Sequence, residues 1–186
     1  AEAGADVIQY RDKACRTTRD YMDIAARVIS GANQFGAQCI VNDRADVATA
    51  TEAAGVHLGS NDLNPRLARR IVGPHAQIGA TANSLEQVLA LSGAPIDYIG
   101  VGPIYGTTSK ANPAPPVGLD MLKTITAAST VPIIAIGGIE PRNIPALMEA
   151  GAHGVAVLSA VTCAKDPVAA TNRFSQAMDL WLKGGR

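Results

Sequence analysis

The chain has 186 residues, of which 47% are hydrophobic and only 4% aromatic, and its 16 basic and 16 acidic residues cancel. This length supports one domain with a substantial core, so we expect residues 1–186 to form a single domain. Without a charge excess or a block of like charge, neither nucleic-acid binding nor membrane-surface binding is expected. No apolar stretch is long enough for a membrane span, and the scattered cysteines are typical of reduced thiols, which predicts a cytoplasmic protein.

Short apolar runs rich in Val and Ile alternate with helix-compatible segments along the chain. This alternation is typical of a parallel sheet, whose strands are apolar on successive residues because both faces are buried. The predicted strands are Val7–Gln9, Cys39–Val41, Val56–Leu58, Gln77–Gly79, Tyr98–Val101, Ile133–Ile136 and Val155–Leu158. The predicted helices are Thr18–Gly31, Ala45–Ala54, Pro65–Val72, Ser84–Leu91, Leu119–Ala128, Asn143–Ala150 and Pro167–Lys183.

A recurring joint between helix and strand indicates how the alternation begins. Glu149-Ala-Gly-Ala-His153 precedes the last strand, and Glu2-Ala-Gly-Ala-Asp6 precedes the first. Because the glycine closes a helix in this pattern, we expect Ala1 in the last turn of a helix. The predicted fold class is therefore α/β, a (β/α)8 TIM barrel that lacks its first β-strand and most of its first helix in this chain. An open doubly wound sheet is the alternative.

In such a barrel the chemistry lies at the carboxyl ends of the strands. After the first strand, Arg11 and Lys13 are two residues apart, so in an extended segment both side chains point the same way. Arginine binds phosphate oxygens bidentately and lysine binds them as a point charge, which together suggest a polyanionic ligand. The alternative is a surface salt bridge to Asp12 or Glu2.

Carboxylates follow the next two strands. Asp43 and Asp62 on neighbouring strand ends, opposite the cations, suggest a single Mg²⁺, which takes one or two carboxylates together with substrate phosphates and water. The alternative for Asp62 is a cap for the helix at Pro65. His57 lies inside an apolar strand and is interpreted as a buried core histidine rather than a catalyst.

After the fourth strand, Ser84 and Gln87 have the form of a capping box, which leaves Thr81 to face the site. A second anion site is predicted where Thr107, Thr108, Ser109 and Lys110 follow a strand. Glycines at 137 and 138 and the residues after the last strand complete the usual phosphate site of these barrels. Two anion sites predict two phosphorylated small-molecule substrates, and one long diphosphorylated ligand is the weaker alternative.

With these residues the sequence resembles the thiamine phosphate synthase (thiamine-phosphate pyrophosphorylase) family over nearly its whole length. The motifs that carry the resemblance are Ile8-Gln-Tyr-Arg-Asp-Lys13, Val41-Asn-Asp-Arg-Ala-Asp46, Gly55-Val-His-Leu-Gly59 with Asp62, Gly102-Pro-Ile-Tyr105 with Thr107, Ser109 and Lys110, and Ala135-Ile-Gly-Gly-Ile139. Each motif alone is weak, but all of them in the family's order are specific.

The resemblance implies condensation of 4-amino-2-methyl-5-hydroxymethylpyrimidine diphosphate with a thiazole phosphate, giving thiamine phosphate and pyrophosphate. It implies a pyrimidine diphosphate site made of Gln9, Arg11, Lys13, Asn42, Thr81 and Lys110, and a thiazole phosphate site made of Thr107, Thr108, Ser109, Gly138, Leu158 and Ser159. Asp43 and Asp62 would hold Mg²⁺. Arg11, Lys13 and Lys110 would be catalytic through their charge, because departure of a diphosphate needs neutralisation and no strong protein base.

The sequence departs from the family at a few positions: Thr81 replaces a frequent serine, Asn83 a histidine and Gly106 a proline. The closest rival function is that of the related thiazole tautomerase, which needs a general base and no diphosphate site. A non-catalytic phosphate-ligand binder or regulator is the other. An open barrel exposes two sheet edges, so we expect that a native N-terminal segment or a partner chain covers them, which leaves a homo-oligomer open.

Overall fold

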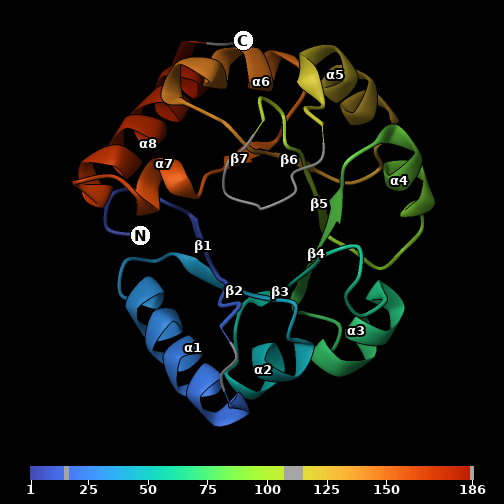
Figure 1. The fold of residues 1–186 in the computed structure, drawn as a ribbon, viewed down its shortest axis with the longest axis vertical. Coiled ribbons are helices and arrows are strands. Elements are labelled where there is room, and N and C mark those ends of the chain that lie inside the picture. The colour runs from blue at the N-terminus through green and yellow to red at the C-terminus, as the bar shows by residue number, and fades with distance from the viewer. Residues whose placement is uncertain (15–16, 107–114, 185–186) are drawn as a thin grey trace. The chain divides into compact units, whose positions relative to one another are not determined.

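The computed structural model describes residues 1–14, 17–106 and 115–184. They fall into two compact units: Ala1–Thr81 with Ala94–Asp97 form unit 1, and Ala82–Gly93 with Tyr98–Arg186 form unit 2. Within each unit, parallel strands alternate with helices (Figure 1). The predicted α/β alternation is thereby confirmed, while a complete or incomplete barrel remains a prediction.

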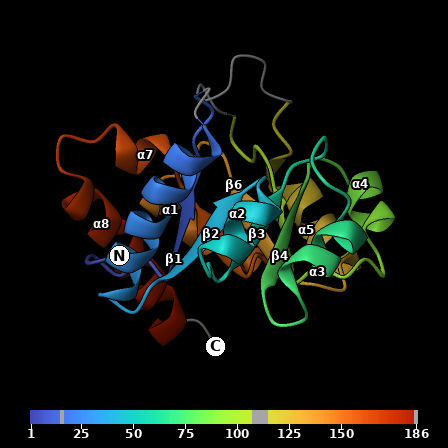
Figure 2. The same cartoon turned by 90° about the horizontal axis from the view of Figure 1, so that it is seen from below.

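Unit 1 contains strands that pair in chain order and are all parallel. Figure 2 shows its helices in front of these strands. The strands are β1 (Val7–Tyr10), β2 (Gln38–Asn42), β3 (Gly55–Leu58) and β4 (Gln77–Ala82), of which Ala82 belongs to unit 2. The helices are α1 (Thr18–Asn33), α2 (Ala45–Ala50) and α3 (Pro65–Val72).

Helix α1 is amphipathic. Its N-cap is Thr17, whose hydroxyl accepts a hydrogen bond from the Asp20 N–H at 3.2 Å. Its buried residues recur every three or four positions, which places them on one face of the helix. They are Tyr21, Ala25, Ile29 and Ala32. This stripe joins the core that encloses Cys39 of β2, so α1 and the first two strands of unit 1 are packed as one layer on another.

Two helix boundaries in unit 1 have local causes. Helix α3 begins at Pro65 as predicted, but its N-cap is Asn64, whose side chain accepts from the Arg66 N–H at 2.9 Å. The alternative role of Asp62 as the cap of this helix is therefore wrong. Helix α2 ends at Ala50 rather than at the predicted Ala54, because Glu52 adopts a left-handed φ of 53° that cannot continue the helix.

Unit 2 contains the parallel strands β5, β6 and β7, in chain order. They are β5 (Tyr98–Val101), β6 (Ile133–Ile136) and β7 (Gly154–Ala156). The helices are α4 (Leu85–Ala90), α5 (Gly118–Ala128), the 3₁₀ helix η1 (Pro141–Asn143), α6 (Ile144–Glu149), α7 (Ser159–Thr162) and α8 (Pro167–Gly184). The predicted capping role of Ser84 is confirmed, since its hydroxyl accepts from the Gln87 N–H at 3.3 Å.

The last strand is shorter than predicted. β7 ends at Ala156 rather than at Leu158, and Ser159 begins the short helix α7, which the sequence analysis did not predict. A helix of one turn carries too little periodicity to be seen in a sequence. Among the described residues, no helix combines the length and the apolar character that crossing a membrane requires.

Candidate functional site

At the strand ends of unit 1, successive side chains point to opposite faces of the sheet. Tyr10 of β1 contacts Tyr21 of α1, with ring centroids 4.8 Å apart. Because successive side chains of a strand point to opposite faces, Gln9 points away from α1. The register of β1 with β2 puts Asn42 on the same face as Gln9. These two predicted substrate-binding residues therefore share the face that is not covered by α1.

Three predicted site residues of unit 1 meet in one charged cluster. The Lys13 ammonium forms a hydrogen-bonded ion pair with the Asp43 carboxylate. The side chains of Asp43 and Asp62 are hydrogen-bonded to each other, and Asp62 also accepts from the Gly59 N–H at 2.7 Å. A cation after β1 and acids after β2 and β3 thus come together in unit 1. The alternative pairing of Lys13 with Asp12 or Glu2 is replaced by its pairing with Asp43.

The backbone at Asp43 ends β2 with a sharp turn. Its φ of 64° is left-handed, a conformation that few residues other than glycine adopt and that aspartate tolerates better than most. Its N–H donates to the His57 carbonyl at 2.8 Å, and the Arg44 N–H donates to the Asn42 carbonyl at 2.8 Å. Such strained backbone is frequent at functional sites, where neighbouring structure holds it in place.

The pKa values of the two acids move in opposite directions. Burial raises the pKa of Asp43, but its hydrogen bonds with Asp62 and Lys13 and the nearby charge of Arg11 outweigh burial, so its pKa lies below the ordinary value. Burial and the hydrogen bond to Asp43 raise the pKa of Asp62, and they outweigh the hydrogen bond from the Gly59 N–H, which lowers it. The pKa of one acid is therefore lowered and that of the other raised, as expected for two carboxyl groups in contact.

The donor set fits Mg²⁺ better than a metal that needs a complete protein cage. Among the described residues, no group of three or more His, Cys, Asp or Glu side chains is arranged to hold a metal. Mg²⁺ characteristically uses one or two carboxylates and fills its remaining positions with water and substrate phosphate. Asp43 and Asp62 supply oxygens at one point, and the ammonium of Lys13 already lies against one of them. Asp43 and Asp62 are therefore residues that would hold the ion, with Lys13 giving up its pairing with Asp43.

His57 has a different environment from the one predicted. It is half-buried rather than enclosed in the core, and its Nε2 lies 2.9 Å from the Thr81 hydroxyl. The sequence leaves Thr81 to face the site, and the structure adds this contact of its hydroxyl with the imidazole. The contact connects β3 with β4 next to the charged cluster.

In unit 2, the described part of the predicted anion site consists of backbone. Gly137 and Gly138 have φ values of 99° and 66°, and the Gly137 carbonyl accepts from the Tyr105 N–H at 3.1 Å. A Cβ at Gly138 would lie 2.3 Å from the Gly106 carbonyl oxygen. The loop after β6 therefore lies against the loop after β5, one residue before Thr107, and only glycine permits this approach. The predicted site residues Thr107, Thr108, Ser109 and Lys110 lie outside the described residues.

The register of β6 with β7 brings the remaining predicted residues close to this loop. Ile136 pairs with Ala156, so Gly138 and Leu158 each lie two residues beyond a paired position. Leu158 is 50% exposed, and Ser159 is the first residue of α7. The predicted phosphate site of unit 2 thus draws on the ends of its three strands.

Two features of unit 1 were missed by the sequence analysis. One is the direct ion pair between Lys13 and Asp43, because the sequence assigns Lys13 to the diphosphate and Asp43 to Mg²⁺. The other is the hydroxyl of Tyr21, which donates to the Asn42 carbonyl at 3.5 Å. No signal hinted at the second, because Tyr21 belongs to the buried stripe of an amphipathic helix.

Parallel α/β units with cations, paired acids and glycine-lined loops at the strand carboxyl ends define a class of proteins that bind phosphorylated small molecules. A family model described as thiamine monophosphate synthase matches residues 1–161. The chain belongs to this family.

Known proteins resemble the chain over most of its length. It is 44% identical over 171 residues to a thiamine-phosphate synthase of Chloroflexus aurantiacus, covering 92% of this chain and 78% of the relative. It is 40% identical over 183 residues to one of Methanocella arvoryzae, covering 98% and 85%. Among solved structures, the thiamine phosphate pyrophosphorylase of Pyrococcus furiosus matches with a TM-score of 0.86 and 34% identity, over 96% of this chain and 85% of the other.

Proposed function

We propose that the chain is a thiamine-phosphate synthase, a transferase that moves a pyrimidinylmethyl group from a diphosphate to a thiazole phosphate. The observation that carries this proposal is the cluster of Lys13, Asp43 and Asp62 at the ends of β1, β2 and β3, in a chain of the thiamine monophosphate synthase family. A diphosphate needs a cation and a metal, and this cluster offers both kinds of partner. We also propose that the fold is a (β/α)8 barrel whose first strand is not part of this sequence.

The proposed reaction separates charge and has little need of a base. The bond between the pyrimidine methylene carbon and the diphosphate oxygen breaks, and pyrophosphate leaves with the electron pair. The thiazole nitrogen then gives its lone pair to the methylene cation, which forms the new carbon–nitrogen bond. Mg²⁺, held by Asp43 and Asp62, would neutralise part of the negative charge that develops on the pyrophosphate.

The chain's own residues would act by charge and position. Arg11 and Lys13 would bind the leaving diphosphate, which lets Lys13 exchange its Asp43 partner for a phosphate oxygen. Gln9, Asn42 and Thr81 would orient the pyrimidine diphosphate. Loop backbone around Gly138, together with Leu158 and Ser159, would hold the thiazole phosphate as the nucleophile. Lys110 and the hydroxyls of residues 107–109 are assigned from the sequence alone, by their place after a strand and by the resemblance.

The rival functions make different demands on unit 1. A thiazole tautomerase moves a proton and would need a general base, but it would have no use for the cluster of Lys13, Asp43 and Asp62. A phosphate-ligand binder would bind both substrates without turnover.

The test is to incubate the protein with the pyrimidine diphosphate and the thiazole phosphate, with Mg²⁺ or with EDTA, and to follow thiamine phosphate and pyrophosphate. Equal amounts of both products, formed only with Mg²⁺, are expected. Binding of both substrates without product by a folded protein would contradict the proposal and favour a binder, whereas isomerisation of a thiazole phosphate would favour the tautomerase.

A further inference from the structure

The hydroxyl of Tyr21 lies between the ends of two strands. Its O–H donates to the Asn42 carbonyl at 3.5 Å, and the Asp12 backbone N–H hydrogen-bonds to its phenolic oxygen. Asp12 directly precedes Lys13, and Asn42 directly precedes Asp43. One hydroxyl therefore links the backbone that carries the cation to the backbone that carries the carboxylate.

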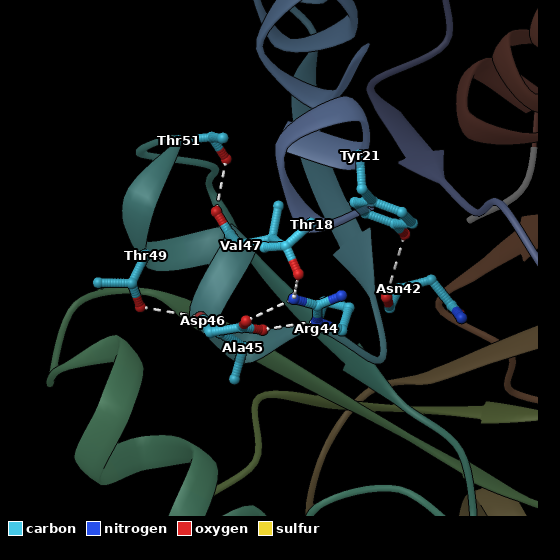
Figure 3. Close-up of polar contacts among 9 residues, drawn as sticks. All are labelled: Thr18, Tyr21, Asn42, Arg44, Ala45, Asp46, Val47, Thr49 and Thr51. Carbon is cyan, nitrogen blue, oxygen red and sulfur yellow. Dashed lines mark hydrogen bonds and ion pairs between the residues drawn. The ribbon is translucent and has the colours of Figure 1, made fainter. Parts of the chain in front are cut away.

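The ring of Tyr21 is itself held from two sides. The residue is 6% exposed and contacts the ring of Tyr10 on one side. The guanidinium carbon of Arg44 lies 5.8 Å from its ring centroid. Arg44 is fixed in turn by Asp46, at 2.8 and 2.6 Å, and by the Thr18 hydroxyl at 3.3 Å (Figure 3). A phenol held this firmly presents its hydroxyl in one direction.

This hydroxyl differs from the ion pair beside it in what happens when a ligand binds. When Asp43 turns to a metal and Lys13 to a phosphate, their mutual ion pair must be given up. The bonds of Tyr21 involve backbone groups and no ligand atom, so they persist. They are therefore suited to keep the cation and the carboxylate at the same spacing before and after binding.

We propose that Tyr21 is a positioning residue for the metal–diphosphate site, acting through the backbone of Asp12 and Asn42. The inference rests on the proposed function, since it assumes that Lys13 and Asp43 share a metal-bound diphosphate. Small displacements of such groups have large effects on rate, which makes a preformed spacing valuable. Tyr21 touches no reacting atom, so its effect is on geometry and not on the chemical step.

The test is Tyr21→Phe, which keeps the ring between Tyr10 and Arg44 and removes only the hydroxyl. The matched control is Thr49→Val in α2, which removes a hydroxyl bonded to the Ala45 and Ile71 carbonyls at 3.0 and 3.3 Å, away from the cluster. Calorimetry would measure the binding of inorganic pyrophosphate with Mg²⁺. Steady-state assays would measure KM for each substrate separately.

Tyr21→Phe is expected to weaken Mg²⁺–pyrophosphate binding by about 5- to 10-fold, the effect of one or two lost hydrogen bonds. KM for the pyrimidine diphosphate should rise by a similar factor, while KM for the thiazole phosphate stays the same. Thr49→Val should leave both the binding and the two KM values unchanged. Arg44→Lys, which loosens the ring without removing the hydroxyl, should weaken pyrophosphate binding by about 2-fold and serves if Tyr21→Phe does not fold.

Wild-type affinity for Mg²⁺–pyrophosphate in Tyr21→Phe would overturn the inference, as would an equal rise of both KM values or an equal effect of Thr49→Val. A failure of the proposed function can be distinguished from a failure of this inference. If the wild-type protein forms no thiamine phosphate but its pyrophosphate binding still depends on Tyr21, the reaction is wrong and the positioning role stands.

Discussion

The two units prepare for an anion in different ways. Unit 1 uses charged side chains, with the Lys13 ammonium paired to Asp43 and the Asp43 carboxylate hydrogen-bonded to Asp62. In unit 2 the described part of the predicted phosphate site is backbone, namely two glycines with positive φ and a loop packed against them, while the predicted Thr107, Thr108, Ser109 and Lys110 lie outside the described residues. Charged side chains and concave loops of backbone N–H groups are two established ways to bind an anion.

This difference predicts which substitutions each unit tolerates. In unit 1, function depends on the chemical identity of a few side chains, and the backbone matters where it holds them in place. In unit 2, we expect function to depend on the absence of a side chain at Gly138. The hydroxyl of Ser159 should matter less, because the backbone N–H groups at the start of α7 remain after any substitution of its side chain.

Asp43→Asn should reduce kcat/KM for the pyrimidine diphosphate by on the order of 10²- to 10³-fold, the usual cost of losing one preorganised charged group. Asparagine tolerates the left-handed backbone at this position, so the fold should survive. Rates across a Mg²⁺ titration, together with thermal melts, would measure both effects. Asp179→Asn is the control, because it removes an exposed carboxylate 4.0 Å from Lys183 and should leave activity unchanged. Undiminished Mg²⁺-dependent turnover in Asp43→Asn would show that the carboxylate is not a ligand.

Gly138→Ala should raise KM for the thiazole phosphate by on the order of 10-fold, because a Cβ 2.3 Å from the Gly106 carbonyl oxygen forces the two loops apart. KM for the pyrimidine diphosphate should not change. Gly93→Ala in the same unit is the control: its φ is 70°, but a Cβ there meets no atom within 4 Å, so it carries the backbone strain alone. Equal effects of the two substitutions on KM would mean that backbone strain alone explains the result, and that the close contact between Gly138 and Gly106 has no role in binding.

Ser159→Ala should raise KM for the thiazole phosphate by only about 2- to 5-fold, the effect of one neutral hydrogen bond. The backbone N–H groups at the start of α7 remain after the substitution. Steady-state kinetics measured beside Gly138→Ala would rank the two residues. A larger rise of KM for the thiazole phosphate in Ser159→Ala than in Gly138→Ala would contradict the account, because a side chain would then matter more than the backbone in unit 2.

The cysteines of the two units should differ in reactivity without any effect on function. Burial raises the pKa of the Cys39 thiol, which is 1% exposed, so near neutral pH it stays protonated and out of reach. Cys163 is exposed. In a Cys15→Ser background, iodoacetamide should therefore modify Cys163 in the native protein and Cys39 only after unfolding. Mass spectrometry would check this, and rapid native modification of Cys39 would mean that the core of unit 1 opens.

The sequence predicted most of the fold because its local signals agree with one another. Helix α3 runs from Pro65 to Val72 as expected, since proline marks the first turn and Gly73 follows the last. The error at the end of α2 came from the left-handed Glu52, a conformation that no residue type requires. Helix α7 was missed because one turn has no measurable period. Local patterns thus predict long elements and fail where the ending depends on tertiary structure.

Candidate site residues were found by their position after strands, which is a local signal. Their partners are not local: Lys13 and Asp43 lie 30 residues apart, and their contact depends on the register of β1 with β2. The role of Tyr21 could not be predicted, because its spacing in α1 is that of any core residue. Sequence therefore indicated candidate groups for the chemistry, and the structure added the contacts of those that it describes.

The proposal places a metal-dependent diphosphate site in unit 1 and a metal-free thiazole phosphate site in unit 2. The most direct test is to titrate each substrate into the protein by calorimetry, with Mg²⁺ and with EDTA. The pyrimidine diphosphate should lose most of its affinity in EDTA, because the site proposed for it includes a metal held by Asp43 and Asp62. The thiazole phosphate should bind equally well in both conditions, since the site proposed for it in unit 2 includes no metal ligand. A thiazole phosphate that needs Mg²⁺, or a pyrimidine diphosphate that does not, would contradict the account.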